Sequence, residues 1–157
     1  MVLETVLDVV CHESAADILS RKGSQVWSIG PDASVFEAVH LMDEKAAGAL
    51  LVLAGGRVVG MISERDYARK VILKGRLSRD TRVSEIMSAP AVTVGPKESV
   101  SDCLRLMTER RIRHLPVIDN GSIAGVLSIG DLVNAVLSAQ AAEMRQLKSY
   151  VAGHYPA

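Results

Sequence analysis

An internal duplication constrains this chain more than any other feature. The heptad at residues 60–66 recurs as residues 125–131, and the same offset aligns residues 29–72 with residues 94–137 without a gap. Identical residues under this offset fall at turn, cap and core positions: Gly30/Gly95, Pro31/Pro96, Ser34/Ser99, Met42/Met107, Leu50/Leu115, Gly56/Gly121, Gly60/Gly125, Ser63/Ser128 and Asp66/Asp131. A period of roughly 60 residues indicates one supersecondary unit that occurs twice.

Both copies show the same order of local signals. A short strand, 26–29 or 91–94, ends at a Gly-Pro turn and is followed by a helix that begins at a capping-box pattern, Ser34 with Glu37 or Ser99 with Asp102. A hairpin follows, with its turn at residues 55–56 or 120–121, and a second helix closes each copy. This order predicts an α/β unit with a small sheet.

Two such units in one chain can bury their apolar sheet faces against each other. We therefore expect an α/β fold of the α+β sandwich type, with the two repeats related by a pseudo-two-fold axis. The expected divisions are an N-terminal extension (1–14), repeat 1 (15–74), a linker (75–81), repeat 2 (82–138) and a C-terminal helical extension (139–157). Residues 17–19 echo residues 85–87, which predicts that each repeat begins before its first strand. The extension continues an apolar stripe that could pack on a second subunit.

The composition and the residue spacing limit the classes of function that we expect. Lys plus Arg equals Asp plus Glu at 18 each, and aromatic residues are only 3%, so we expect no nucleic-acid partner. No apolar stretch approaches the ~20 residues of a membrane span, and no signal peptide is apparent, so we expect a cytoplasmic protein without a membrane partner. No nucleophile–base pair, carboxylate cluster or metal-ligand spacing stands out. We therefore expect no enzyme activity, no metal site and no catalytic cofactor.

The two heptads, Gly-Met-Ile-Ser-Glu-Arg-Asp and Gly-Val-Leu-Ser-Ile-Gly-Asp, resemble the signature of cystathionine beta-synthase (CBS) domains. Residues 111–117 are likewise similar to second repeats of small stand-alone bacterial CBS pairs. The resemblance implies a tandem pair, or Bateman module. Such a regulatory sensor binds AMP, ADP, ATP, S-adenosylmethionine or NAD(H) in the cleft between its repeats. It also implies a homodimer that acts on an effector protein, here unidentified.

By position, the resemblance assigns phosphate contacts to Ser63 and Ser128 and ribose contacts to Asp66 and Asp131. The other nucleotide contacts that it implies are Val26, Gly48, Ala49 and Arg65 for one site, and Val92, Ile112, Arg113, His114 and Pro116 for the other.

Elementary chemistry agrees with these roles but leaves an alternative open. A helix start offers unpaired amides to a phosphate, and an ionised carboxylate can accept both hydrogen bonds of a ribose diol. However, Ser-x-x-Asp at a helix start is also an ordinary capping box. If the motif only caps helices, the alternative function is a protein–protein interaction scaffold without a nucleotide ligand. Trp27 and Cys103 are interpreted as core residues rather than functional ones.

Overall fold

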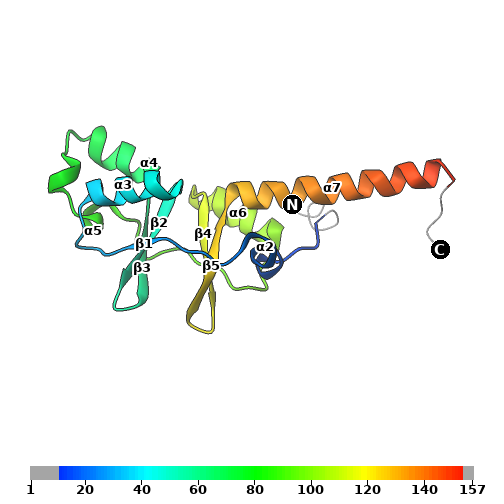
Figure 1. Cartoon of the computed structure of the whole chain (residues 1–157), viewed down its shortest axis with the longest axis horizontal. Helices are drawn as coiled ribbons and strands as arrows, with labels where there is room; N and C mark the ends of the chain where they lie inside the picture. Colours follow the sequence, from blue (N-terminus) through cyan, green and yellow to red (C-terminus); the bar gives the residue numbers. More distant parts are fainter. Residues whose placement is uncertain (1–10, 154–157) are drawn as a thin grey trace. The chain divides into compact units, whose positions relative to one another are not determined.

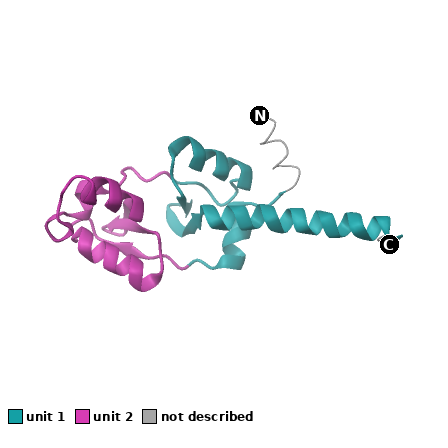
Figure 2. Cartoon of the chain, turned by 90° about the horizontal axis from the view of Figure 1, so that it is seen from above, with its two compact units in different colours: residues 1–24, 93–157 teal, residues 25–92 magenta. Residues whose placement is uncertain are grey.

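The structure, a computed structural model, describes residues 11–153 as two compact units (Figure 2). Unit 2 is the continuous segment Gln25–Val92, and unit 1 combines the chain up to Ser24 with the chain from Thr93 onward. Parts of both predicted extensions, residues 1–10 and 154–157, lie outside the described residues. No helix within residues 11–153 is long and apolar enough to cross a membrane.

Unit 2 contains a three-stranded sheet in the order β1-β2-β3, with β1 parallel to β2 and β2 antiparallel to β3 (Figure 1). Its elements are β1 (Ser28–Ile29), α3 (Val35–Lys45), β2 (Ala49–Ala54), β3 (Arg57–Ser63), α4 (Glu64–Tyr67), a π-helical turn η1 (Ala68–Ile72), a 3-10 turn η2 (Ser78–Asp80) and α5 (Val83–Ile86). The predicted linker, 75–81, therefore contains a short turn of helix.

Unit 1 repeats this arrangement with fewer strands. Its elements are α2 (Ala15–Lys22), α6 (Val100–Arg110), β4 (His114–Asp119), β5 (Ser122–Ser128) and α7 (Ile129–Val151). The predicted strand 91–94 is reduced to a single parallel bridge between Val94 and Val117. This bridge lies at the position where Ile29 pairs with Val52 in unit 2, and the hairpins of both units carry a bulge one residue later. The duplication thus extends to the strand register.

The predicted helix starts are confirmed in both units. The hydroxyls of Ser34 and Ser99 accept hydrogen bonds from the amides of Glu37 and Asp102, each at 3.1 Å. The reciprocal bond forms only in α3, because the Asp102 carboxylate instead accepts from Arg105 at 2.9 Å.

Each unit has its own apolar core beneath its sheet. Met42, Leu50 and Ile62 are fully buried in unit 2, and Met107, Leu115 and Leu127 occupy the equivalent core positions in unit 1. Trp27 packs against the core of unit 2. Cys103 is fully buried, and burial raises the pKa of its thiol to about 11, so its assignment to the core is confirmed.

The first helix of each repeat packs in an unexpected way. Helix α2 lies against β5 of the second copy, and the backbone of Ser88, just after α5, pairs with Met61 of β3 in the first copy. The echoing segments 17–19 and 85–87 therefore contact the hairpin of the opposite sequence copy. As a result, the compact units and the sequence repeats divide the chain at different residues.

Candidate functional site

The two heptad serines lie where the hairpin ends and a helix begins. Ser63 ends β3 and caps α4, and Ser128 ends β5 and caps α7. Each hydroxyl accepts from the amide of the aspartate three residues later, at 3.2 Å in both units. The two junctions therefore have the same local geometry, as the duplication predicts.

The heptad aspartates complete these capping boxes. Asp66 Oδ2 accepts from the Ser63 amide at 2.9 Å and from its hydroxyl at 3.0 Å, and Asp131 Oδ2 accepts from the Ser128 amide at 2.7 Å. Their side chains are only 14% and 20% exposed. The capping role left open by the sequence is thus realised at both junctions, and it uses one carboxylate oxygen of each aspartate.

A lysine ammonium also contacts each of these carboxylates. Lys70 Nζ lies 3.0 Å from Asp66 Oδ1 and donates to the Ile86 carbonyl at 2.8 Å. Lys22 Nζ, from α2, lies 2.6 Å from Asp131 Oδ2 and donates to the Val126 carbonyl at 2.7 Å. In unit 2 the bonds therefore involve both oxygens of Asp66, whereas in unit 1 they converge on Asp131 Oδ2.

The surroundings of Asp131 favour its charged form. Partial burial by itself would raise the pKa of this carboxyl, but the Lys22 ammonium and the Ser128 amide outweigh burial and lower it below its ordinary value. The carboxylate is therefore ionised at neutral pH and acts only as a hydrogen-bond acceptor.

His114 faces the same group of charges. It pairs with Ser128 across the β4–β5 hairpin. Burial lowers the pKa of His114, and the positive charges of Lys22 and Arg113 lower it further, although Asp131 opposes them. Because an ordinary histidine already titrates near pH 6.5, His114 is neutral at pH 7. A charge-assisted bond from His114 to a phosphate is therefore disfavoured, although a neutral ring can still donate one hydrogen bond.

Backbone pairing brings several other predicted residues to the junctions. In unit 2 the Glu64 amide donates to the Gly48 carbonyl at 3.0 Å, and Ala49 pairs with Ser63. In unit 1 the Ile129 amide donates to the Arg113 carbonyl at 2.9 Å. Gly48 and Ala49 thus lie beside the first heptad serine, and Arg113 and His114 lie beside the second.

The other residues that were predicted to contact the nucleotide lie on several different elements. Arg65 is in the first turn of α4, and Val26 precedes Trp27, whose carbonyl accepts from Leu51 of β2. Ile112 and Pro116 flank the junction residues of β4, and the Pro116 carbonyl accepts from the Val94 amide at 3.0 Å. Val92 is the last residue of unit 2, so it belongs to a different compact unit from the other residues predicted for the second site.

The heptad glycines have a packing role. A Cβ atom on Gly60 would lie 2.7 Å from the Ser88 carbonyl oxygen and 2.9 Å from the Met87 sulfur. A Cβ atom on Gly125 would lie 2.7 Å from Leu19 Cδ2. Contacts this short would force the neighbouring atoms to shift, so glycine permits the close approach of the first segment of each repeat. Sequence reasoning identified these glycines but not what they contact.

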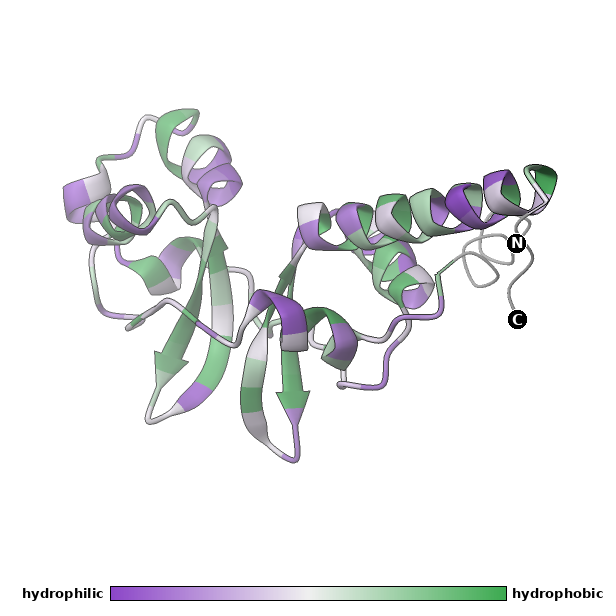
Figure 3. Cartoon of the chain, turned by 45° about the vertical axis from the view of Figure 1, so that its right-hand side comes forward, coloured by the Kyte–Doolittle hydropathy of each residue, from purple (hydrophilic) through white to green (hydrophobic). Residues whose placement is uncertain are grey.

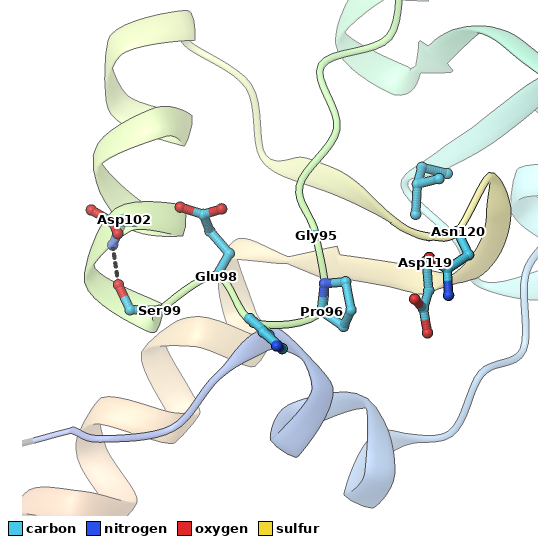
Figure 4. Close-up of a pocket in the computed structure, with 9 residues that line it drawn as sticks. Gly95, Pro96, Glu98, Ser99, Asp102, Asp119 and Asn120 are labelled. Carbon is cyan, nitrogen blue, oxygen red and sulfur yellow. Dashed lines mark hydrogen bonds between the residues drawn. The ribbon is translucent and has the colours of Figure 1, made fainter.

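A separate hollow of about 510 Å³ lies at the other end of the β4–β5 hairpin (Figure 4). Its lining residues are Gly95, Pro96, Lys97, Glu98, Ser99, Asp102, Ile118, Asp119 and Asn120. The sequence predicted none of these as a nucleotide contact. The three lining carboxylates give this hollow an acidic character that is unfavourable for a phosphate.

Comparison with known proteins decides the family. The CBS domain profile matches the chain twice, over residues 15–73 and 83–138. This chain belongs to the CBS domain family. Its two matches make it a tandem CBS pair.

Individual relatives agree with this assignment. The CBS pair is 40% identical to the mitochondrial CBS domain-containing protein CBSX3 of Arabidopsis thaliana, over 87% of this chain and 68% of the relative. A solved structure, described as a putative signal-transduction protein with CBS domains from Burkholderia ambifaria, is 46% identical with a TM-score of 0.78, and the match covers 80% of this chain and 95% of that one. A hexameric CBS-CP12 protein from bloom-forming cyanobacteria is 33% identical with a TM-score of 0.70, over 77% of this chain and 70% of that one.

Proposed function

We propose that this CBS pair is a regulatory sensor that binds an adenine nucleotide at its strand-to-helix junctions. The observation that carries the proposal is the duplicated arrangement of a serine hydroxyl, first-turn helix amides and an aspartate carboxylate. Helix-start amides suit a phosphate, and a carboxylate suits the two donors of a ribose diol. The resemblance of the two heptads to the CBS signature supports phosphate contacts for Ser63 and Ser128 and ribose contacts for Asp66 and Asp131.

We propose further that the two junctions differ in affinity. Helix α7 has 23 residues, whereas α4 has four before the π-helical turn, so the dipole at the second junction is more fully developed. Among the described residues, the hydrogen bonds and the ion pair of Asp131 involve Oδ2, which leaves Oδ1 as an acceptor, whereas those of Asp66 involve both oxygens. The junction at Ser128 and Asp131 should therefore bind the nucleotide more tightly.

Isothermal titration calorimetry with AMP, ATP, NADH and S-adenosylmethionine tests this function. At least one of these compounds should bind the wild-type protein. Asp131→Asn should weaken that binding roughly tenfold or more, because it removes a charged acceptor. Asp102→Asn is the matched control, since Asp102 also lies in the first turn of a helix but outside both junctions, and it should bind like wild type. Absence of binding for all four compounds would contradict the proposal and leave helix capping as the role of the aspartates.

We also propose that the protein self-associates as a homodimer and signals to a separate effector protein. The hexameric CBS-CP12 relative and the exposed apolar residues of α7 support self-association. Light scattering during gel filtration should give a mass of at least two chains, and a monomer mass at micromolar concentration would contradict it.

A further inference from the structure

Helix α7 extends beyond the described elements of unit 1 that contact it. Leu132 and Ala135 are buried, and the helix contacts α6, α2 and β5 of its own unit. From Gln140 to Val151 every residue is exposed, and this part of the helix extends away from the other elements of unit 1 (Figure 2). More than half of the length of α7 is thus left largely exposed by the described residues of its own unit.

The exposed part of α7 is not uniformly polar, and apolar residues recur to its end (Figure 3). The side chains form a stripe along one face, and their exposed fractions are 43% for Val133, 56% for Leu137, 57% for Met144, 61% for Leu147 and 81% for Val151. With Gln140 included, the spacing alternates between four and three residues. This is the repeat of a two-stranded coiled coil, and five of its six seam positions are apolar.

We propose that α7 pairs with α7 of a second copy of this chain, in parallel and in register. In heptad terms, Leu137, Met144 and Val151 occupy the a positions, and Val133, Gln140 and Leu147 occupy the d positions. This inference specifies the surface and orientation of the self-association proposed above and does not depend on nucleotide binding.

The charged residues beside the stripe favour a second copy of α7 as the partner and a parallel arrangement of the two helices. In this register Glu143 is at g and Lys148 is at the following e position. They are five residues apart, so they are not neighbours on one helix face. In a parallel pair the g residue of one helix faces the next e residue of the other, which brings Glu143 opposite Lys148 on both sides of the seam. An antiparallel pair would instead bring g against g and e against e, and therefore like charges together.

The single polar seam residue favours the same arrangement. Gln140 would be surrounded by apolar side chains if the two helices were shifted by one heptad, whereas in register its amide meets the amide of the other copy. A polar residue at a seam position is a known means of fixing register. The stripe covers fewer than three heptads, and an isolated helix of this length is only marginally stable in water. Packing against a second copy would therefore supply much of the stability of the exposed part of α7.

Oxidative cross-linking of single-cysteine variants in the full chain tests the pairing. The native thiols, Cys11 and Cys103, are buried, so they provide a low background. Gln140→Cys and Leu147→Cys should each form a disulfide-linked dimer on a non-reducing gel. Ala142→Cys, exposed on the outer f position, should remain at background.

The results of this cross-linking experiment distinguish a parallel α7 pair from an antiparallel pair and from self-association through another surface. Cross-linking of Gln140→Cys and Leu147→Cys no greater than that of Ala142→Cys would overturn the proposal. Cross-linking that appears only when those two variants are mixed would show an antiparallel pair and would also overturn it. If light scattering gives a dimer while neither cysteine cross-links, the self-association stands and its assignment to α7 fails.

A charge exchange provides the second test. In the Gln140→Cys background, Glu143→Lys should slow cross-linking about fivefold, since it replaces two attractive contacts by two repulsive ones. Adding Lys148→Glu should restore the original rate. Failure of this second change to restore the rate would contradict the parallel arrangement.

Discussion

Each heptad aspartate accepts a hydrogen bond in the capping box at its helix start and also forms an ion pair with a lysine. Lys22, which bonds Asp131, is 109 residues away in sequence, so no local pattern could have predicted this contact. The serine and aspartate positions were predictable, because a capping box is a local motif with fixed spacing. The contact of Lys22 could not be predicted, since it depends on how α2 packs, whereas Lys70 follows Asp66 by four residues, a spacing that one helical turn brings together.

The ion pair between Lys22 and Asp131 should compete with a ribose diol for the carboxylate. We expect Lys22→Met to raise the affinity for adenosine, which has no phosphate, about threefold, because partly exposed ion pairs contribute up to about 1 kcal/mol. Arg21→Met is the control, since Arg21 is on the same helix but pairs with Glu13. Calorimetry should detect the difference, and a lower adenosine affinity for Lys22→Met would contradict the competition.

His114 should make the stability of the protein depend on pH. Its pKa is lowered in the folded protein, so the unfolded chain binds more protons, and the free energy of unfolding rises with pH. The stability should therefore fall as pH drops below about 6.5, the ordinary histidine value. His114→Gln should reduce this slope between pH 7 and pH 5, measured by urea unfolding, whereas His40→Gln, at an exposed position on α3, should retain it. An unchanged slope in His114→Gln would show that another group is responsible.

At the scale of elements, the heptad glycines determine how closely α2 and α5 approach the hairpins. Gly60→Ala should reduce the free energy of unfolding by about 1–3 kcal/mol, because the new methyl group would meet a backbone carbonyl oxygen. Gly125→Ala should cost less, since the end of the flexible Leu19 side chain can move. Gly30→Ala has open space around the new Cβ atom and is the control. Equal losses for Gly60→Ala and Gly125→Ala in urea unfolding would contradict this packing account.

The sequence predicted most elements, and the exceptions have physical causes. Helices α3, α6 and α7 and both hairpins carry strong local signals, namely caps, apolar periodicity and turn glycines. The first strand of each copy was predicted too long, since it has only one neighbouring strand and forms a short ladder in unit 2 and a single bridge in unit 1. Contacts of α2 and α5 with the opposite copy could not be inferred, because segments 17–19 and 85–87 are similar to each other.

At the scale of the whole molecule, duplication was the most informative feature of the sequence. It predicted the order of elements in both copies and the placement of a serine and an aspartate at equivalent junctions. It did not predict where the compact units divide the chain, because neighbours in sequence need not belong to the same packed unit. The family match over residues 15–73 and 83–138 follows the sequence copies rather than the compact units.

The most direct test of nucleotide binding follows individual backbone amides by NMR during a titration with AMP. We expect the amides of Ser63, Asp66, Ser128 and Asp131 to shift as AMP is added, with the second junction saturating first. Saturable shifts confined to the hollow around Gly95 and Asn120, or no shifts at all, would contradict it.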